Sequence, residues 1–229
     1  MKHAVVTPAL KKTSLDATDV NNYRPISNLS FLSKLLERCA HTQIMNYLNE
    51  NNLLPGKQSA YRKYHSTETA LLDLLSDANI AADDGKVTLL GMLDQSSAFD
   101  TIDHKILLQR MRSSCGFSGM VLEWLKSYIT DRTQVVHFNG EVSTVAVLCS
   151  GIPQGSVLGP LIFIIYSADV IRIIQECGFK AHAYADDLQI YAQTDPMHTT
   201  QLMSRFSSCM DKVNDWMASN RLCLNPSKT

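Results

Sequence analysis

Apolar residues recur at helical spacing in the first part of the chain. The pattern from Phe31 to Leu48 predicts one helix, which the segment Leu53–Gly56 ends. The apolar positions between Leu71 and Ile80 predict a second helix, and Ser66 or Thr67 is suited to cap its beginning. The first elements that the pattern predicts are therefore helices.

The hydrophobic period then changes. The short apolar run Lys86–Asp94 predicts a buried strand that ends on a carboxylate. Asn139-Gly140 between two apolar runs predicts a tight hairpin. The same patterns predict helices at 104–115, 121–129, 156–175 and 204–217, and strands at 134–138, 142–148, 179–184, 188–191 and 222–224. This order indicates an α+β fold, with a sheet covered by helices on one face and no linker dividing the chain.

Composition narrows the class of protein. The 229 residues are 45% hydrophobic and 19% charged, which excludes disordered, collagen-like and coiled-coil chains. Six scattered cysteines without a CxxC pair argue against a disulfide framework or a zinc site, so we expect reduced thiols in an intracellular protein. No secretory signal and no apolar run of about 20 residues is visible, so no membrane association is expected.

The net charge of −1 conceals an asymmetry. Residues 1–63 hold 9 Lys/Arg against 4 Asp/Glu, and residues 64–229 hold 12 against 18. A basic front part can meet phosphates and an acidic back part can hold metal cations, although uneven surface charge alone gives the same count.

Carboxylates mark two places where chemistry is expected. Asp94 ends a buried strand, and Asp186-Asp187 occupies the turn between two strands. Neighbouring carboxylates disfavour each other's ionisation, and a divalent cation removes that cost. The alternative is structural, because turns favour aspartate for local backbone hydrogen bonds.

A third segment, Gly151–Pro160, combines Gly and Pro just before an apolar helix. This density predicts a tight loop on which another group lies closely, although a plain lead-in to the helix has the same composition. The segment lacks the GxxxxGK[ST] pattern of a P-loop.

Together these residues resemble reverse transcriptases, and most closely those of non-LTR (LINE-type) retrotransposons. LDQSSAFD at 93–100, GIPQGSVLGP at 151–160 and YADD at 184–187 look like the family's motifs A, B and C. The similarity extends to 21–37, 58–72 and 224–229, and so covers nearly the whole chain. Gln95 stands where the family usually has an apolar residue, and Ser167-Ala168-Asp169 replaces a more usual Ile-Asn-Asp.

The resemblance implies a right-hand polymerase with fingers and palm, in which helices back an antiparallel palm sheet. It places a lead-in at 1–20 and the reverse transcriptase domain at 21–229, with fingers at about 21–85 and palm at about 86–229. The sequence stops at the lysine of motif D, so the thumb is expected to be absent.

Roles follow from the resemblance, position by position. It implies metal binding by Asp94, Asp186 and the backbone carbonyl of Gln95, with Asp187 as a partner of the catalytic pair. The remaining roles are triphosphate contacts for Arg62 and Lys63, discrimination at the sugar 2′ position for Phe99, packing beside the template base and nucleotide for Gln154 and Gly155, nucleic-acid contacts for Arg24 and Lys57, and proton donation to pyrophosphate for Lys228.

The implied function is RNA-directed DNA polymerisation, a two-metal addition of deoxynucleotides to a primer 3′ hydroxyl. The implied cofactor is Mg²⁺, as two ions that Mn²⁺ can replace, and the partners are an RNA template, a DNA primer and deoxynucleoside triphosphates. Location in the nucleus or cytoplasm follows from the family alone. Two alternatives remain: a truncated, inactive retrotransposon fragment with at most nucleic-acid binding, and another metal-dependent phosphotransferase.

Overall fold

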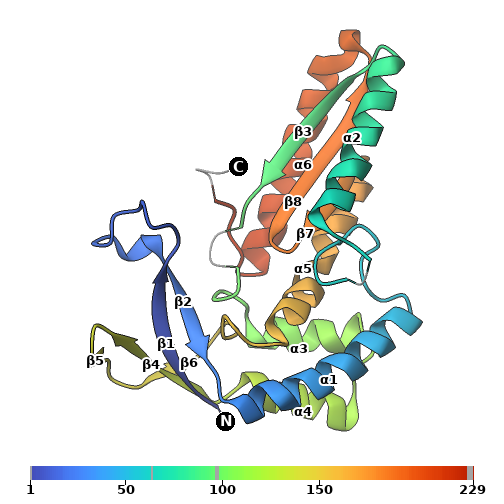
Figure 1. The fold of residues 1–229 in the computed structure, drawn as a ribbon. Coiled ribbons are helices and arrows are strands. Elements are labelled where there is room, and N and C mark those ends of the chain that lie inside the picture. The colour runs from blue at the N-terminus through green and yellow to red at the C-terminus, as the bar shows by residue number, and fades with distance from the viewer. Residues whose placement is uncertain (1, 63, 96–97, 226–228) are drawn as a thin grey trace. The chain divides into compact units, whose positions relative to one another are not determined.

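The computed structural model describes residues 2–62, 64–95, 98–225 and 229. The elements in chain order are β1 (His3–Leu10), η1 (Val20–Asn22), β2 (Tyr23–Asn28), α1 (Phe31–Glu50), α2 (Thr67–Asp83), β3 (Val87–Leu93), α3 (His104–Ser113), α4 (Gly119–Ile129), β4 (Arg132–Phe138), β5 (Glu141–Val142), β6 (Ala146–Leu148), α5 (Gly159–Glu176), β7 (Lys180–Tyr184), β8 (Asp187–Thr194), η2 (Pro196–His198) and α6 (Thr199–Ser219) (Figure 1).

The chain forms two compact units, each made from two separate stretches of sequence. Unit 1 contains residues 1–53 and 99–162, and unit 2 contains residues 54–98 and 163–229. The division into fingers and palm near residue 85 stays a prediction. No helix formed by the described residues combines the length and apolar character that a membrane crossing requires.

Unit 1 is built on a sheet in which β1 lies between β2 and β4. β1 pairs antiparallel with β2 and parallel with β4, while β5 and β6 both pair with β4. The predicted hairpin is confirmed, because Asn139 (φ 50°) and Gly140 (φ 84°) both have the positive φ of a type I′ turn. The strand predicted at 142–148 is split in two. Ser143 interrupts it by hydrogen bonding to Val136 through both its backbone N–H and its Oγ.

Residues 1–20, predicted as a lead-in, have a larger part in the fold. Their strand β1 lies in the interior of the first sheet, with Ala4 and Val6 buried. The strand was missed because its pairing partners, β2 and β4, lie elsewhere in the sequence. The segment is therefore an integral part of unit 1.

The helices of unit 1 begin where the sequence indicates. Asp103 caps α3, since its carboxylate accepts hydrogen bonds from the backbone N–H groups of Lys105 and Ile106. α1 is fixed to the segment after α3 by the Tyr47 hydroxyl, which donates to the Cys115 carbonyl at 2.9 Å. The largest fully buried side chains among the described residues of this unit are Leu48, Ile102, Leu107, Met111, Leu125, Ile129, Leu158, Leu161 and Ile162.

Unit 2 contains an antiparallel sheet in the order β3-β8-β7. Residues paired across these strands share a face, and successive residues alternate between faces. On one face, Phe206 of α6 lies against Gly91 of β3, where an added Cβ would be 2.6 Å from its ring. On the other face, Tyr191 donates a hydrogen bond to Asp77 of α2.

Helices therefore cover both faces of this sheet, with α2 and α6 running along it in Figure 1. The antiparallel pairing and the helical cover agree with the prediction, but cover on one face only was wrong. The physical reason lies in α2, whose carboxylates bind polar side chains of the sheet face opposite α6. A pattern of hydrophobic residues does not indicate packing that polar side chains form.

Candidate functional site

The register of unit 2 gathers aspartates at one end of its sheet. Leu93, the last residue of β3, pairs with Leu188, the second residue of β8. Asp94 therefore leaves β3 beside the start of β8 at Asp187. Because Tyr184 pairs with Asp187, only Ala185 and Asp186 form the turn between β7 and β8. The structure thus brings Asp94, Asp186 and Asp187 to the same sheet end, and we call Ala185–Asp186 the aspartate turn.

Asn225 is a residue of this site to which the sequence assigned no role. Its side-chain Nδ2 donates to Asp94 Oδ2 at 3.1 Å, and its backbone N–H donates to the Asp94 carbonyl at 2.8 Å. The preceding Leu224 forms an isolated bridge with Gln95. The sequence contained one signal of this role, because Asn225 is an amide donor within the stretch 224–229 that carries part of the family resemblance.

The aspartates at this sheet end have the oxygen ligands that divalent cations such as Mg²⁺ bind. Asp94 and Asp186 are both half-buried. Among the described residues, no group of three or more His, Cys, Asp or Glu side chains is arranged to hold a metal ion. Mg²⁺ typically uses one or two carboxylates together with waters and substrate phosphates, so a pair of aspartates matches that ion.

A tyrosine lies close to the aspartate turn. Burial raises the pKa of Tyr61, and the neighbouring Asp186 and Tyr184 raise it further. The hydroxyl therefore stays protonated next to the carboxylate. Tyr61 has a φ of 59°, and Tyr64 has a φ of 65°, so the described part of the loop between Leu54 and Ser66 holds two non-glycine residues in left-handed conformation.

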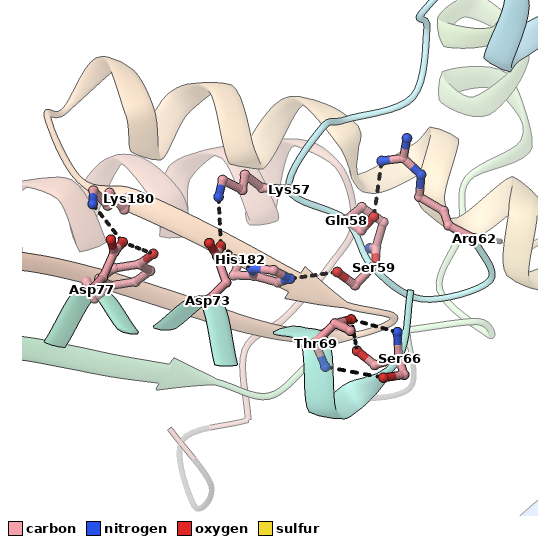
Figure 2. A network of polar contacts seen from close by, with 11 residues as sticks. Lys57, Gln58, Ser59, Arg62, Ser66, Thr69, Asp73, Asp77, Lys180 and His182 are labelled. Atoms are coloured by element: carbon pink, nitrogen blue, oxygen red, sulfur yellow. Dashed lines mark hydrogen bonds and ion pairs between the residues drawn. The ribbon is translucent and has the colours of Figure 1, made fainter. Parts of the chain in front are cut away.

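Figure 2 shows a polar network between this loop, α2 and β7. The Lys57 ammonium lies 2.7 Å from Asp73 Oδ2, and this hydrogen bond is the largest cause that lowers the pKa of Asp73. His182 is buried, with Nδ1 3.4 Å from Asp73 Oδ2 and Nε2 2.7 Å from Ser59 Oγ. Lys57, predicted to contact nucleic acid, is thus engaged in a salt bridge at a partly exposed position.

The same network continues one helical turn along α2. Asp77 accepts hydrogen bonds from the Lys180 ammonium at 2.7 Å and from the Tyr191 hydroxyl at 2.8 Å. Asp73 and Asp77 lie four residues apart on the helix, and their partners His182 and Lys180 lie two apart on β7. Both spacings keep side chains on one face, so α2 is aligned with the strand that leads into the aspartate turn.

Arg62 is anchored within its own loop. Its Nη1 donates to the Pro55 carbonyl at 3.0 Å and to the Gln58 carbonyl at 3.3 Å. Two other predicted positions, Lys63 and Lys228, lie outside the described residues. Arg24 is exposed on β2 of unit 1.

In unit 1, the segment Gly151–Pro160 packs on the backbone that follows Ala98. Gly151 N–H donates to the Ile102 carbonyl at 2.8 Å, and Ile152 N–H donates to the Phe99 carbonyl at 2.9 Å. Gly151 has a φ of 79°, and a Cβ there would lie 2.7 Å from the Asp100 carbonyl oxygen. The expectation of a loop on which another group lies closely is therefore confirmed, and that group is the chain's own backbone.

Gln154 and Gly155 join this loop to β2. The Gln154 carbonyl accepts from Ser27 N–H at 2.7 Å, and its side-chain Nε2 donates to Asp100 Oδ2 at 3.1 Å. Gly155 has a φ of 104°, and a Cβ there would lie 3.0 Å from the Ser27 carbonyl oxygen. Asp100 keeps an exposed edge, yet surrounding atoms partly desolvate its carboxylate and raise its pKa, against the lowering effect of Gln154.

A cavity of about 300 Å³ opens beside these residues, lined by the loop and by parts of β1, β2, β4 and β6. Volumes of this size hold small organic ligands. Asp100 and Gln154, which hydrogen bond to each other, are among its polar lining residues. The sequence selected Gln154, but it did not select Asp100, because a single aspartate ahead of a helix is a common feature of turns.

Comparison with known proteins connects these features to a family. The family model described as reverse transcriptase (RNA-dependent DNA polymerase) matches residues 10–229. A probable RNA-directed DNA polymerase from transposon BS of Drosophila melanogaster is 36% identical over 149 residues, which are 65% of this chain and 16% of that protein. The RNA-directed DNA polymerase from mobile element jockey of Drosophila melanogaster is 26% identical over 224 residues, 96% of this chain and 24% of that protein.

Solved telomerase structures share the fold. Apo telomerase from Candida tropicalis, truncated from its C-terminal domain, has a TM-score of 0.67 at 13% identity and covers 99% of this chain and 49% of its own. Telomerase from the same organism, in complex with a TWJ fragment of telomeric RNA, has a TM-score of 0.70 at 12% identity, with coverage of 99% and 40%. The chain spans 16% to 24% of the two Drosophila relatives. The chain belongs to the reverse transcriptase (RNA-dependent DNA polymerase) family, among the proteins of non-LTR retrotransposons.

Proposed function

We propose that this chain catalyses RNA-directed DNA synthesis, adding deoxynucleotides to the 3′ hydroxyl of a DNA primer on an RNA template. One observation carries the proposal: the β3–β8 register places Asp94 beside the strand that begins directly after Asp186. A family match over residues 10–229 supports the same activity.

Asp94, Asp186 and the backbone carbonyl of Gln95 would hold the divalent cations, Mg²⁺ or Mn²⁺, with Asp187 next to them. Such cations stabilise the charge that develops on the attacking and leaving oxygens of a phosphoryl transfer. Asn225 orients the Asp94 carboxylate through its 3.1 Å hydrogen bond. Tyr61 stays protonated and adds no negative charge beside Asp186.

The remaining residues bind and select substrates. Arg62 and Lys63 meet the triphosphate, for which an Arg fork suits the phosphate oxygens. Phe99 excludes a sugar 2′ hydroxyl, and Gln154 and Gly155 pack beside the template base and the nucleotide.

Three further lysines and arginines complete the assignment. Arg24 and Lys57 contact nucleic-acid phosphates, which makes template binding salt-dependent. Lys228 donates a proton to the leaving pyrophosphate.

The test is primer extension by the purified chain on an RNA template with a DNA primer, in Mg²⁺ and in Mn²⁺. We expect Asp186→Asn to reduce extension by more than about a hundredfold and to leave thermal unfolding unchanged. The matched control is Asp195→Asn, because Asp195 is exposed and directly follows the opposite end of strand β8. That control should extend like the wild type.

Two outcomes contradict the proposal. Equal extension by wild type and Asp186→Asn would show that Asp186 takes no part in the reaction. Absence of extension in either metal would favour the alternative of an inactive fragment with at most nucleic-acid binding, since the chain spans only 16% and 24% of the two Drosophila relatives.

A further inference from the structure

The aspartate turn has a backbone conformation that its sequence does not favour. Ala185 has a φ of 57°, a left-handed conformation that glycine adopts readily and alanine adopts only at an energetic cost. Asp186 follows directly, so the direction of its carboxylate depends on the backbone of Ala185. Such a conformation persists when surrounding contacts hold it.

A segment distant in sequence lies beside this turn and extends the sheet. Ala183 N–H donates to the Lys57 carbonyl at 2.8 Å, and Ser59 N–H donates to the Ala183 carbonyl at 2.9 Å. Gln58 thereby forms a parallel bridge with Ala183 of β7. Strand alternation places Lys57 and Ser59 on the side of His182, where Ser59 Oγ lies 2.7 Å from His182 Nε2. The side chain of Gln58 therefore takes the opposite side.

The buried side chain of Gln58 contacts the turn itself. Its Oε1 accepts from Ala60 N–H at 2.9 Å and from Ala185 N–H at 3.2 Å, and its Nε2 lies 3.4 Å from the Ala185 carbonyl oxygen. A single amide thus meets both peptide groups of Ala185, as a neighbouring strand would do.

The space beside this contact leaves little room for water. The cavity beside the turn, lined by Gln58, Gln95, Ser167 and Ala185 among others, measures about 10 Å³, at the lower limit for a single water molecule. With Gln58 in place, the amide and not solvent is therefore the partner of the Ala185 peptide groups on this side.

The backbone of Gln58 serves a second predicted group. Its carbonyl accepts from Arg62 Nη1 at 3.3 Å, a bond drawn in Figure 2. One residue is therefore bonded through its side chain to the aspartate turn and through its main chain to the arginine assigned to the triphosphate.

We propose that Gln58 is a positioning residue, which holds Ala185 in its left-handed conformation and so fixes the direction of the Asp186 carboxylate. The expected effect of Gln58 on catalysis rests on the proposed function. Its expected effect on the conformation of the aspartate turn does not. Removal of Gln58 should leave the unit folded, release the Ala185 amide and weaken metal binding at Asp186.

The test compares Gln58→Met, of similar length but without hydrogen bonds, with Tyr166→Phe. Tyr166 is a matched control because its buried hydroxyl donates to the Asn220 carbonyl at 2.6 Å within the same unit. We measure hydrogen exchange of the Ala185 amide by NMR, the affinity for Mn²⁺ alone, and the kcat and KM of primer extension.

For Gln58→Met we expect about tenfold faster exchange at Ala185, a Kd for Mn²⁺ raised about tenfold, and kcat lowered ten- to a hundredfold. Tyr166→Phe should change none of these by more than about threefold. Unchanged exchange at Ala185 overturns the proposal, and so does faster exchange with wild-type Mn²⁺ affinity.

A second variant covers the case in which Gln58→Met does not fold. Gln58→Glu keeps an acceptor for the N–H groups of Ala60 and Ala185 but has no donor for the Ala185 carbonyl, so it should keep the exchange of the Ala185 amide within about threefold of wild type. Loss of that protection would refute the role of Gln58 as a positioning residue. If the wild type extends no primer, the proposed function fails, whereas exchange and Mn²⁺ affinity still decide the role of Gln58.

Discussion

Gly151→Ala tests how closely the loop before α5 lies on the backbone of Asp100. A side chain at a φ of 79° costs about 1–2 kcal/mol in a non-glycine residue. The added Cβ would also lie 2.7 Å from the Asp100 carbonyl oxygen and 2.9 Å from its Cα, so backbone must move. Overpacking of this kind typically costs a further 1–3 kcal/mol. We expect a total loss of about 2–5 kcal/mol.

Gly140→Ala is the matched control in the same unit. Gly140 has a φ of 84°, but nothing lies within 4 Å of an added Cβ. The substitution Gly140→Ala should therefore cost only the conformational contribution, about 1–2 kcal/mol. Urea unfolding in a Trp216→Phe background follows unit 1, because fluorescence then reports on Trp124 of α4 only. If the free energies of unfolding of Gly151→Ala and Gly140→Ala differ by less than about 0.5 kcal/mol, the close approach of the added Cβ to Asp100 does not destabilise the unit.

Two further changes test the reaction. Phe99→Ala should admit ribonucleotides and reduce the preference for deoxynucleotides at least about tenfold in competition assays. Unchanged discrimination between the two would show that Phe99 does not select the sugar. Asn225→Leu removes the side-chain donor to Asp94 Oδ2, so it should lower the extension rate about ten- to a hundredfold and raise the Mg²⁺ concentration needed for half-maximal extension. If the variant needs no more Mg²⁺ than the wild type, the 3.1 Å contact does not orient the carboxylate.

Local signals in the sequence predicted those parts of the fold that local chemistry decides. Ser66 forms a capping box with Thr69 at the start of α2, as the cap prediction requires. Asp103 caps α3, and Asn139-Gly140 forms the hairpin. In each case the residues that form the structure are neighbours in the chain, so their identity contains the information.

The missed features depend on distant partners. Strand β1 is fixed by pairing with β4, whose residues lie more than a hundred positions away. Gln58 and Ala185 lie 127 positions apart, and Asn225 and Asp94 lie 131 apart. A glutamine or an asparagine in a polar segment carries no local sign of such a contact. The family resemblance predicted which aspartates matter, but it did not predict which amides hold them.

The network on α2 makes unit 2 sensitive to pH through His182. Burial lowers the pKa of His182 below its ordinary value of 6.5. Asp73 opposes this shift, whereas Lys57 and His65 lower the pKa further, and Ser59 hydrogen bonds to the ring. The folded state therefore binds fewer protons than the unfolded state below pH 6.5, so His182 stabilises unit 2 above that pH and loses its contribution as the pH falls.

The neighbouring carboxylate titrates in a separate window. The Lys57 hydrogen bond lowers the pKa of Asp73 below its ordinary value of 3.8, so its contribution is lost only below that pH. Between pH 6.5 and about 5, the free energy of unfolding should therefore fall for wild type and fall less for His182→Gln, which keeps a polar group but cannot titrate. Parallel pH profiles for the two proteins in urea unfolding, followed by fluorescence of Trp216 in a Trp124→Phe background, would show that His182 is not held neutral against α2.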